Sequence, residues 1–289
     1  MDLNFILIAA AVLGGIALIS AIILFFISKA FKVEEDPLID EVSEQLPGAN
    51  CGGCGYPGCR GLAEAIVKAG SIEGLVCPAG GSDTMSNVAK VLGVTAVEID
   101  PIIAVLKCNG SCEFAPAKSL YDSALSCAYA STLFSGESGC QFGCLGCGDC
   151  VSVCKFDALK MDPVTKLPVV DEVNCVGCGA CVKACPRYLL EIRNKGKKNR
   201  RIYVACSNQD KGAFAKKNCA VACIGCGKCV KVCAFDAITV NNNLAYIDET
   251  KCKLCRKCVS ECPTNAIIEV NFPPKKEVIA TEEVLESVN

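Results

Sequence analysis

The chain has 289 residues, 26 cysteines, no histidine and no tryptophan, and its formal net charge is −2. The absence of histidine excludes a His-ligated haem, a Rieske cluster, a Cys/His zinc finger and a Ser-His-Asp triad. The small negative charge argues against a general polyanion binder, so no nucleic-acid partner is expected. The cysteines fall in tight runs, which is typical of metal or iron–sulfur ligation in a reducing compartment.

The first predicted element is a transmembrane anchor over residues 1–30. Residues 3–28 carry no charged side chain, and about 20 apolar residues are enough to span a bilayer. A secretory signal peptide is the alternative, but the chain lacks a basic start and its apolar core is too long. Lys29 and Lys32 follow the apolar segment, so the positive-inside rule predicts that the C-terminal bulk is cytoplasmic.

Residues 33–95 are predicted to form a small helical module around the loop CGGCGYPGC, residues 51–59. Helical spacing is expected over 60–70 and over 85–94, each ending at a glycine. The loop and the following CPAGG supply four thiols that predict one 4Fe-4S cluster: Cys51, Cys54, Cys59 and Cys77. A structural zinc ion is the alternative for this set. The loop also matches GxGxxG, but no apolar strand precedes it, so a nucleotide site is rejected.

Four later runs have the spacing C-x2-C-x2-C-x3-C, the ligand run of two-cluster bacterial ferredoxins. In those proteins three cysteines hold one cluster and the fourth serves its neighbour. The predicted ligand sets are therefore Cys144, Cys147, Cys150 with Cys185; Cys175, Cys178, Cys181 with Cys154; Cys223, Cys226, Cys229 with Cys262; and Cys252, Cys255, Cys258 with Cys233. Zinc would leave no role for the third and fourth cysteine of a run.

The runs belong to an internal duplication. The cysteines of the second run of each unit recur 77 residues later, and an earlier group recurs 79 residues later, which pairs Cys127 with Cys206 and Cys140 with Cys219. The predicted domains are a first two-cluster ferredoxin domain over 144–200 and a second over 223–272. A Cys-containing connector over 96–143, a linker over 201–222 and a tail over 273–289 complete the chain.

Six cysteines lie outside the predicted ligand sets: Cys108, Cys112, Cys127, Cys140, Cys206 and Cys219. The first four could hold a sixth cluster; alternatively, some of the six are buried small hydrophobes. Basic residues also gather over 193–201 and at Lys211, Lys216 and Lys217. They are interpreted as a solvated loop or as a docking patch for an acidic electron carrier.

Together these features predict an α+β fold: one N-terminal transmembrane helix, a small helical 4Fe-4S module and two tandem bacterial-ferredoxin-like domains. The N-terminal helix, FKVEEDPLIDEV, CGGCGYPGCRGLAEAI with CPAGG, and the ferredoxin runs resemble the B subunits of the Rnf family. That family comprises ion-translocating ferredoxin:NAD oxidoreductase complexes of bacterial membranes. The chain is similar to the extended type, which has two two-cluster units.

The resemblance implies a subunit that accepts electrons from reduced ferredoxin on the cytoplasmic face of the inner membrane. It would relay them through 4Fe-4S clusters to other Rnf subunits, which reduce NAD while Na⁺ or H⁺ is exported. No nucleotide loop or flavin-attachment signal is present, so no NAD chemistry is expected on this chain. The order of the motifs suggests electron entry at the C-terminal units and exit at the loop near the anchor. A relay that feeds a hydrogenase or a redox-sensor reducing system, and a zinc-binding scaffold, are the alternatives.

Overall fold

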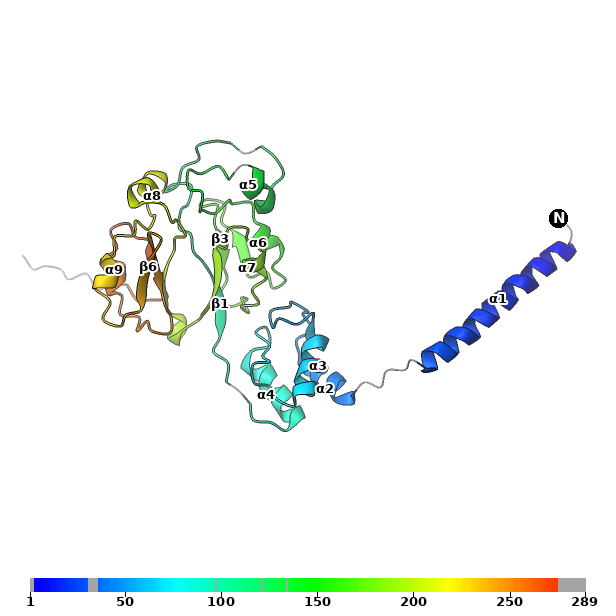
Figure 1. Ribbon diagram of the computed structural model, residues 1–289. Helices are drawn as coiled ribbons and strands as arrows, with labels where there is room; N and C mark the ends of the chain where they lie inside the picture. The colour runs from blue at the N-terminus through cyan, green and yellow to red at the C-terminus, as the bar shows by residue number, and fades with distance from the viewer. Residues whose placement is uncertain (1–2, 31–35, 97, 121, 134, 275–289) are drawn as a thin grey trace, which may run out of the picture.

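The computed structural model describes residues 3–30, 36–96, 98–120, 122–133 and 135–274. Its N-terminal helix, α1 (Leu3–Ala30), extends away from the rest of the chain (Figure 1). The segment Ala11–Lys29 has a mean hydropathy of 2.6 and none of it is buried against the protein. A long helix that exposes apolar side chains all round has the length and composition of a membrane span.

Three helices form the small module beside the cysteine loop: α2 (Pro37–Gln45), α3 (Cys59–Ala69) and α4 (Gly81–Leu92). Asp36 caps α2 by accepting a hydrogen bond from the Leu38 amide, and Pro37 occupies the first helical position. The core of the module is a cluster of apolar side chains that includes Val42, Leu62 and Met85. The expected helices after the loop are therefore present, and α4 begins earlier than the sequence pattern predicts.

The remaining elements form two copies of one unit. The first copy pairs β2 (Leu159–Met161) with β3 (Pro168–Val170) and β1 (Ile102–Leu106) with β4 (Leu190–Asn194), and carries the short helices α6 (Asp149–Ser152) and α7 (Ala180–Ala184). The second pairs β6 (Ile238–Asn241) with β7 (Leu244–Ile247) and β5 (Arg201–Val204) with β8 (Ile267–Val270), with α9 (Lys228–Lys231) and α10 (Lys257–Ser260). All four pairings are antiparallel, so the duplication extends from sequence to topology.

The segments predicted as connector and linker contribute strands to these units. β1 comes from residues 96–143 and β5 from residues 201–222, and each pairs with the last strand of its unit. The connector also holds α5 (Cys127–Leu133), and the second unit has α8 (Gly212–Asn218) before its first ligand run. A short 3-10 helix, η1 (Lys197–Asn199), joins the two units. The predicted tail lies outside the described residues from residue 275 onward.

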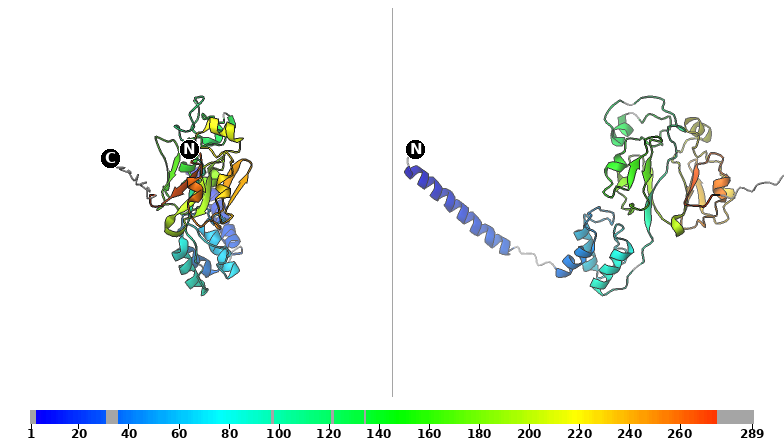
Figure 2. Two further views of the ribbon diagram at one scale, coloured as in Figure 1. Left: turned by 90° about the vertical axis from the view of Figure 1, so that its left-hand side faces the viewer. Right: turned by 180° about the vertical axis from the view of Figure 1, so that it is seen from behind.

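The two units lie side by side and share one core (Figures 1 and 2). Ile103 and Leu190 of the first unit are buried together with Tyr203 and Ala205 of the second. Apolar burial of this kind is non-directional and holds the two units as one body.

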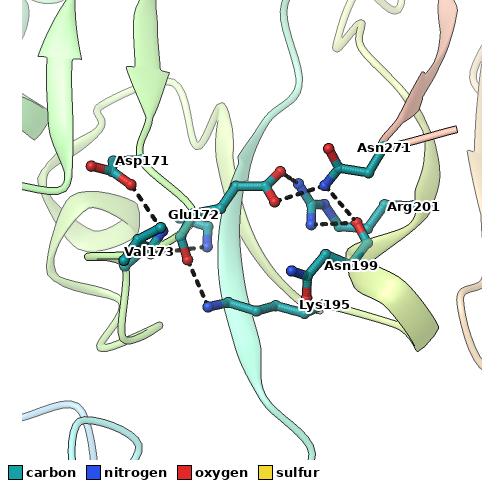
Figure 3. A network of polar contacts seen from close by, with 9 residues as sticks. Asp171, Glu172, Val173, Lys195, Asn199, Arg201 and Asn271 are labelled. Carbon is teal, nitrogen blue, oxygen red and sulfur yellow. Dashed lines mark hydrogen bonds and ion pairs between the residues drawn. The ribbon is translucent and has the colours of Figure 1, made fainter. Parts of the chain in front are cut away.

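A polar network completes the interface between the units (Figure 3). The Glu172 carboxylate, just after β3, forms an ion pair with Arg201 on β5 and accepts a hydrogen bond from the Asn271 amide at 2.7 Å. The Lys195 ammonium donates to the Glu172 carbonyl oxygen at 2.7 Å. Arg201 is only 7% exposed, so the network stabilises a cation that burial would otherwise penalise.

Candidate iron–sulfur sites

The loop of the helical module surrounds the first group of thiols. Cys77 is buried in the module core, and its thiol lies near the thiols of Cys51 and Cys59. Cys54 packs against the same core. Gly52 and Gly55 have φ angles of 70° and 87°, which glycine adopts without the steric penalty of a Cβ. The structure thus brings the four predicted ligands of this module around one tight turn.

The four ferredoxin runs surround four cavities. Three cavities are each lined by one complete predicted set, including the fourth cysteine from the paired run: Cys154, Cys175, Cys178 and Cys181; Cys223, Cys226, Cys229 and Cys262; and Cys233, Cys252, Cys255 and Cys258. The remaining cavity is lined by Cys144, Cys150 and Cys185 of the predicted set and also by Cys127. Cys147, the other predicted ligand there, lies next to Cys127.

A further cavity between the two units is lined by four cysteines that the ferredoxin pattern does not use: Cys108, Cys140, Cys206 and Cys219. Two of their sulfurs accept backbone hydrogen bonds from the first residues of ligand runs. The Cys144 amide donates to Cys108 Sγ at 3.5 Å, and the Cys223 amide donates to Cys206 Sγ at 3.3 Å. The side-chain amide of Asn208, which is 1% exposed, donates to Cys140 Sγ at 3.4 Å.

This cavity lies on a local symmetry between the two units. Cys108 follows β1 by two residues, as Cys206 follows β5. The backbones after the two strands are bonded to each other, because the Asn109 amide donates to the Ala205 carbonyl at 3.0 Å. The Ser207 hydroxyl donates to the Lys107 carbonyl at 3.1 Å. Each unit therefore supplies two of the four thiols.

The predicted sixth set of Cys108, Cys112, Cys127 and Cys140 is wrong in two of its members. Cys112 is exposed, and its thiol contacts the Thr165 carbonyl at 3.8 Å. Cys127 lines the first ferredoxin cavity instead. Their places are taken by Cys206 and Cys219 of the second unit.

The error arose from the register of the duplication. Cys108 precedes Cys144 by 36 residues, whereas Cys206 precedes Cys223 by 17, so the first unit carries an insertion that includes α5. The offset of 79 residues between Cys127 and Cys206 is therefore coincidental, and Cys108 is the counterpart of Cys206. The available signal was the apolar strand followed by a cysteine in both IIAVLKCN and RIYVACSN.

The chemistry of the thiol groups fits iron–sulfur clusters. Burial raises the pKa of Cys206 to about 12 and that of Cys219 to about 11, so these thiols ionise only when a cation compensates their charge. Among the described residues, no three Cys, Asp or Glu side chains converge closely enough to hold a single metal ion. All-sulfur sets that surround a cavity without meeting at one point suit a polynuclear cluster better than mononuclear zinc.

One buried cation lies between two of the sites. The Arg187 guanidinium donates to the carbonyl oxygens of Gly143 and Ser135, and it lies near Cys108 and Cys144. Burial lowers the pKa of Arg187. The corresponding residue of the second unit is Thr264, which also follows a Cys-Pro pair, so this positive charge is specific to the first unit. A cation there stabilises negative charge on the neighbouring thiolates.

The six thiol groups are neighbours in one continuous row. Cys51 of the loop lies near Cys178, Cys181 lies near Cys150, and Cys229 lies near Cys258. The two amide–sulfur hydrogen bonds described above join the central cavity to a ferredoxin site on either side. The row therefore runs from the loop, through the first unit and the central cavity, to the second unit.

The basic stretch over 193–201 is partly structural. Arg193 is 4% exposed and lies 5.1 Å from the centre of the Tyr246 ring, and Arg201 is buried against Glu172. These two cations therefore cannot form part of a docking patch. Lys197, Lys198, Lys211, Lys216 and Lys217 are exposed.

The fold and the thiol groups define a membrane-associated polyferredoxin that holds several 4Fe-4S clusters. Family models agree: a model described as "4Fe-4S dicluster domain" matches residues 143–189 and 222–266, a second model with the same description matches 174–237, and a model described as "Putative Fe-S cluster" matches 46–74.

The chain is also similar to curated proteins along most of its length. It is 44% identical to the B subunit of the Na(+)-translocating ferredoxin:NAD(+) oxidoreductase complex of Acetobacterium woodii, with 92% of this chain and 78% of that protein covered. It is 41% identical to the B subunit of the proton-translocating complex of Clostridium ljungdahlii, with 92% and 93% covered. It is 39% identical to the B subunit of the ion-translocating oxidoreductase complex of Methanosarcina acetivorans, with 89% and 96% covered.

The chain therefore belongs to the family of B subunits of the Rnf complex, the ion-translocating ferredoxin:NAD⁺ oxidoreductase. The resemblance inferred from the sequence motifs is confirmed. Other subunits of that complex are its partners, and its role is that of an electron relay within a translocating oxidoreductase. This family membership disfavours both a zinc scaffold and a relay to a hydrogenase.

Proposed function

We propose that the chain accepts electrons from reduced ferredoxin at its C-terminal unit and delivers them at the loop of the helical module. The observation that carries this proposal is the continuous row of six thiol groups. A bound 4Fe-4S cluster supplies a one-electron carrier at each group. The protein supplies the spacing, because each group shares a hydrogen bond or a close approach with the next.

The proposed ligands of five clusters are the twenty cysteines predicted from spacing, in the sets given above. The proposed ligands of a sixth are Cys108, Cys140, Cys206 and Cys219, which line the cavity between the units. Without a carrier in this cavity the two ferredoxin units would be separated by an unused gap in the row. Cys127 and Cys112 have no part in the sixth set.

The proposed orientation places the ferredoxin units in the cytoplasm and the loop nearest the membrane. Lys29 at the end of α1 is a positive residue of the kind retained on the cytoplasmic side. The loop begins about 20 residues after α1, whereas the second unit is the farthest from α1 in the chain. Electron exit at the loop then brings the end of the row closest to the membrane subunits.

The direction is tested by removing the loop site. The double variant Cys51→Ala/Cys54→Ala deletes two of its four thiols, and the other groups lie outside the loop. In the assembled complex, reduced ferredoxin should still bleach the ferredoxin-type clusters in stopped-flow absorbance, while NAD⁺ reduction should stop. Undiminished NAD⁺ reduction would contradict exit at the loop. A chain without iron and acid-labile sulfide would contradict the cluster assignment itself.

A further inference from the structure

The first ferredoxin site differs from the other three in having a fifth cysteine. In the three other sites the second cysteine of the run lines the cavity: Cys178, Cys226 and Cys255. At the first site this place is taken by Cys127, which lines the cavity with Cys144, Cys150 and Cys185. The Cys147 thiol is directed instead at the Leu145 carbonyl oxygen, at 3.6 Å.

Cys127 is held in this position by a dedicated contact. The Asp149 carboxylate accepts hydrogen bonds from the Cys127 amide at 2.9 Å, from the Ala128 amide at 3.1 Å and from the Ser126 hydroxyl at 3.0 Å. Asp149 lies within the ligand run itself, between Cys147 and Cys150. The start of α5 is thus fixed to the loop that carries the ligands.

The second unit lacks both halves of this arrangement. The residue that corresponds to Asp149 is Lys228, between Cys226 and Cys229, and a lysine cannot accept these hydrogen bonds. The insertion that carries α5 is also absent, because Cys206 and Cys223 are separated by only 17 residues. The extra thiol and the carboxylate that positions it therefore occur together in one copy.

We propose that Cys127 is an alternative fourth ligand of the first ferredoxin cluster, interchangeable with Cys147. Cys127 is 9% exposed and lies beside the Cys147 thiol, which is more open to solvent. In the exchange an Fe–S bond to Cys127 forms as the Fe–S bond to Cys147 breaks. The incoming thiol gives its proton to the leaving thiolate, so the charge and the iron count are unchanged. The inference rests on the proposed assignment of this site to a 4Fe-4S cluster.

The duplication supplies a matched control. In anaerobically purified full-length chain, Cys226→Ala removes the corresponding ligand of the second unit, where no fifth cysteine is present in the cavity. That variant should lose about one iron per chain and show the EPR signal of an oxidised three-iron cluster. Cys147→Ala and Cys127→Ala should each keep the full iron content without that signal. The double variant Cys127→Ala/Cys147→Ala should behave like Cys226→Ala.

Loss of iron in either single variant, or full iron content in the double variant, would overturn the exchange. A second measurement uses the wild-type holoprotein and so does not depend on folding of a variant. Brief anaerobic alkylation with iodoacetamide, followed by peptide mass spectrometry, should label one thiol of the Cys127–Cys147 pair per chain. Labelling of both thiols or of neither would overturn the proposal. Wild-type protein without any clusters would instead refute the assignment on which the proposal rests.

Discussion

Gly53 lies where the loop of the helical module meets the first ferredoxin unit. A Cβ atom at this position would lie 2.8 Å from the Cα of Cys178 and 2.9 Å from its carbonyl oxygen, so only glycine allows this approach. Lys155, which stands where the ferredoxin pattern has proline, donates to the Asn50 carbonyl oxygen at 3.2 Å across the same contact. A departure from the pattern thus serves to dock the loop.

Gly53→Ala should therefore separate the loop from the first unit. Overpacking typically costs about 1–3 kcal/mol, which would weaken the contact by roughly tenfold or more. We expect faster hydrogen exchange in the segment around Cys178 and slower reduction of the loop cluster, with an unchanged iron content. Gly55→Ala is the control, since Gly55 has a positive φ but nothing within 4 Å of its Cβ position. Equal effects of the two substitutions would indicate loop strain and not contact.

At the level of elements, the sequence predicted what local spacing determines. The four ligand runs and their exchange of fourth cysteines could be predicted because three closely spaced thiols and a following helical turn form one local unit. The helices of the module followed from their periodicity and their terminal glycines Gly70 and Gly93.

The central cavity could not be predicted in the same way, because its four thiols come from segments that meet only through the pairing of β1 with β4 and of β5 with β8. The insertion with α5 then moved Cys127 into the register where Cys108 belonged. A long-range juxtaposition of this kind depends on tertiary packing, to which local patterns are blind.

The contact between β5 and the first unit depends on Glu172. Glu172→Ala should leave the Arg201 guanidinium buried with only the Asn199 carbonyl as acceptor, at 3.1 Å. Removing one partner of a buried pair costs about 3–5 kcal/mol, and we expect about 2–3 kcal/mol here because Glu172 is 28% exposed. Native-state hydrogen exchange of β5 and β8 in the anaerobic holoprotein measures this loss.

The control for Glu172 is Asp40→Ala, which breaks the ion pair with Arg60. Those side chains are 65% and 47% exposed, so less than about 1 kcal/mol should be lost at α2 and α3. Unchanged protection of β5 in Glu172→Ala would show that the shared apolar core alone holds the two units together.

At the scale of the whole molecule, the duplication generates a site that neither copy has alone. Each unit contributes one thiol after its first strand and one thiol four residues before its first ligand run. The symmetry of the strands thereby places a carrier site midway between two pairs of ferredoxin sites. Arg187 then breaks the symmetry, since its charge lies beside the first unit only.

Opening this central site should divide the relay in two. In Cys206→Ala/Cys219→Ala the second unit loses both of its thiols in the cavity, while the five other predicted sets remain intact. We expect a loss of about four irons and about four sulfides per chain, the content of one 4Fe-4S cluster. Stopped-flow reduction by ferredoxin should then bleach the second unit rapidly and the first unit only slowly, because the electrons must cross the gap between them.

Cys112→Ala is the matched control for the central site, since Cys112 is exposed and its thiol contacts only a backbone carbonyl in the part of the chain that the structure describes. It should keep the iron content and the single rapid phase of the wild type. If the double variant instead retains all its iron, the cavity holds no cluster. If it loses iron but is reduced in one rapid phase, electrons enter the first unit directly, and the central site lies off the route from ferredoxin to the loop.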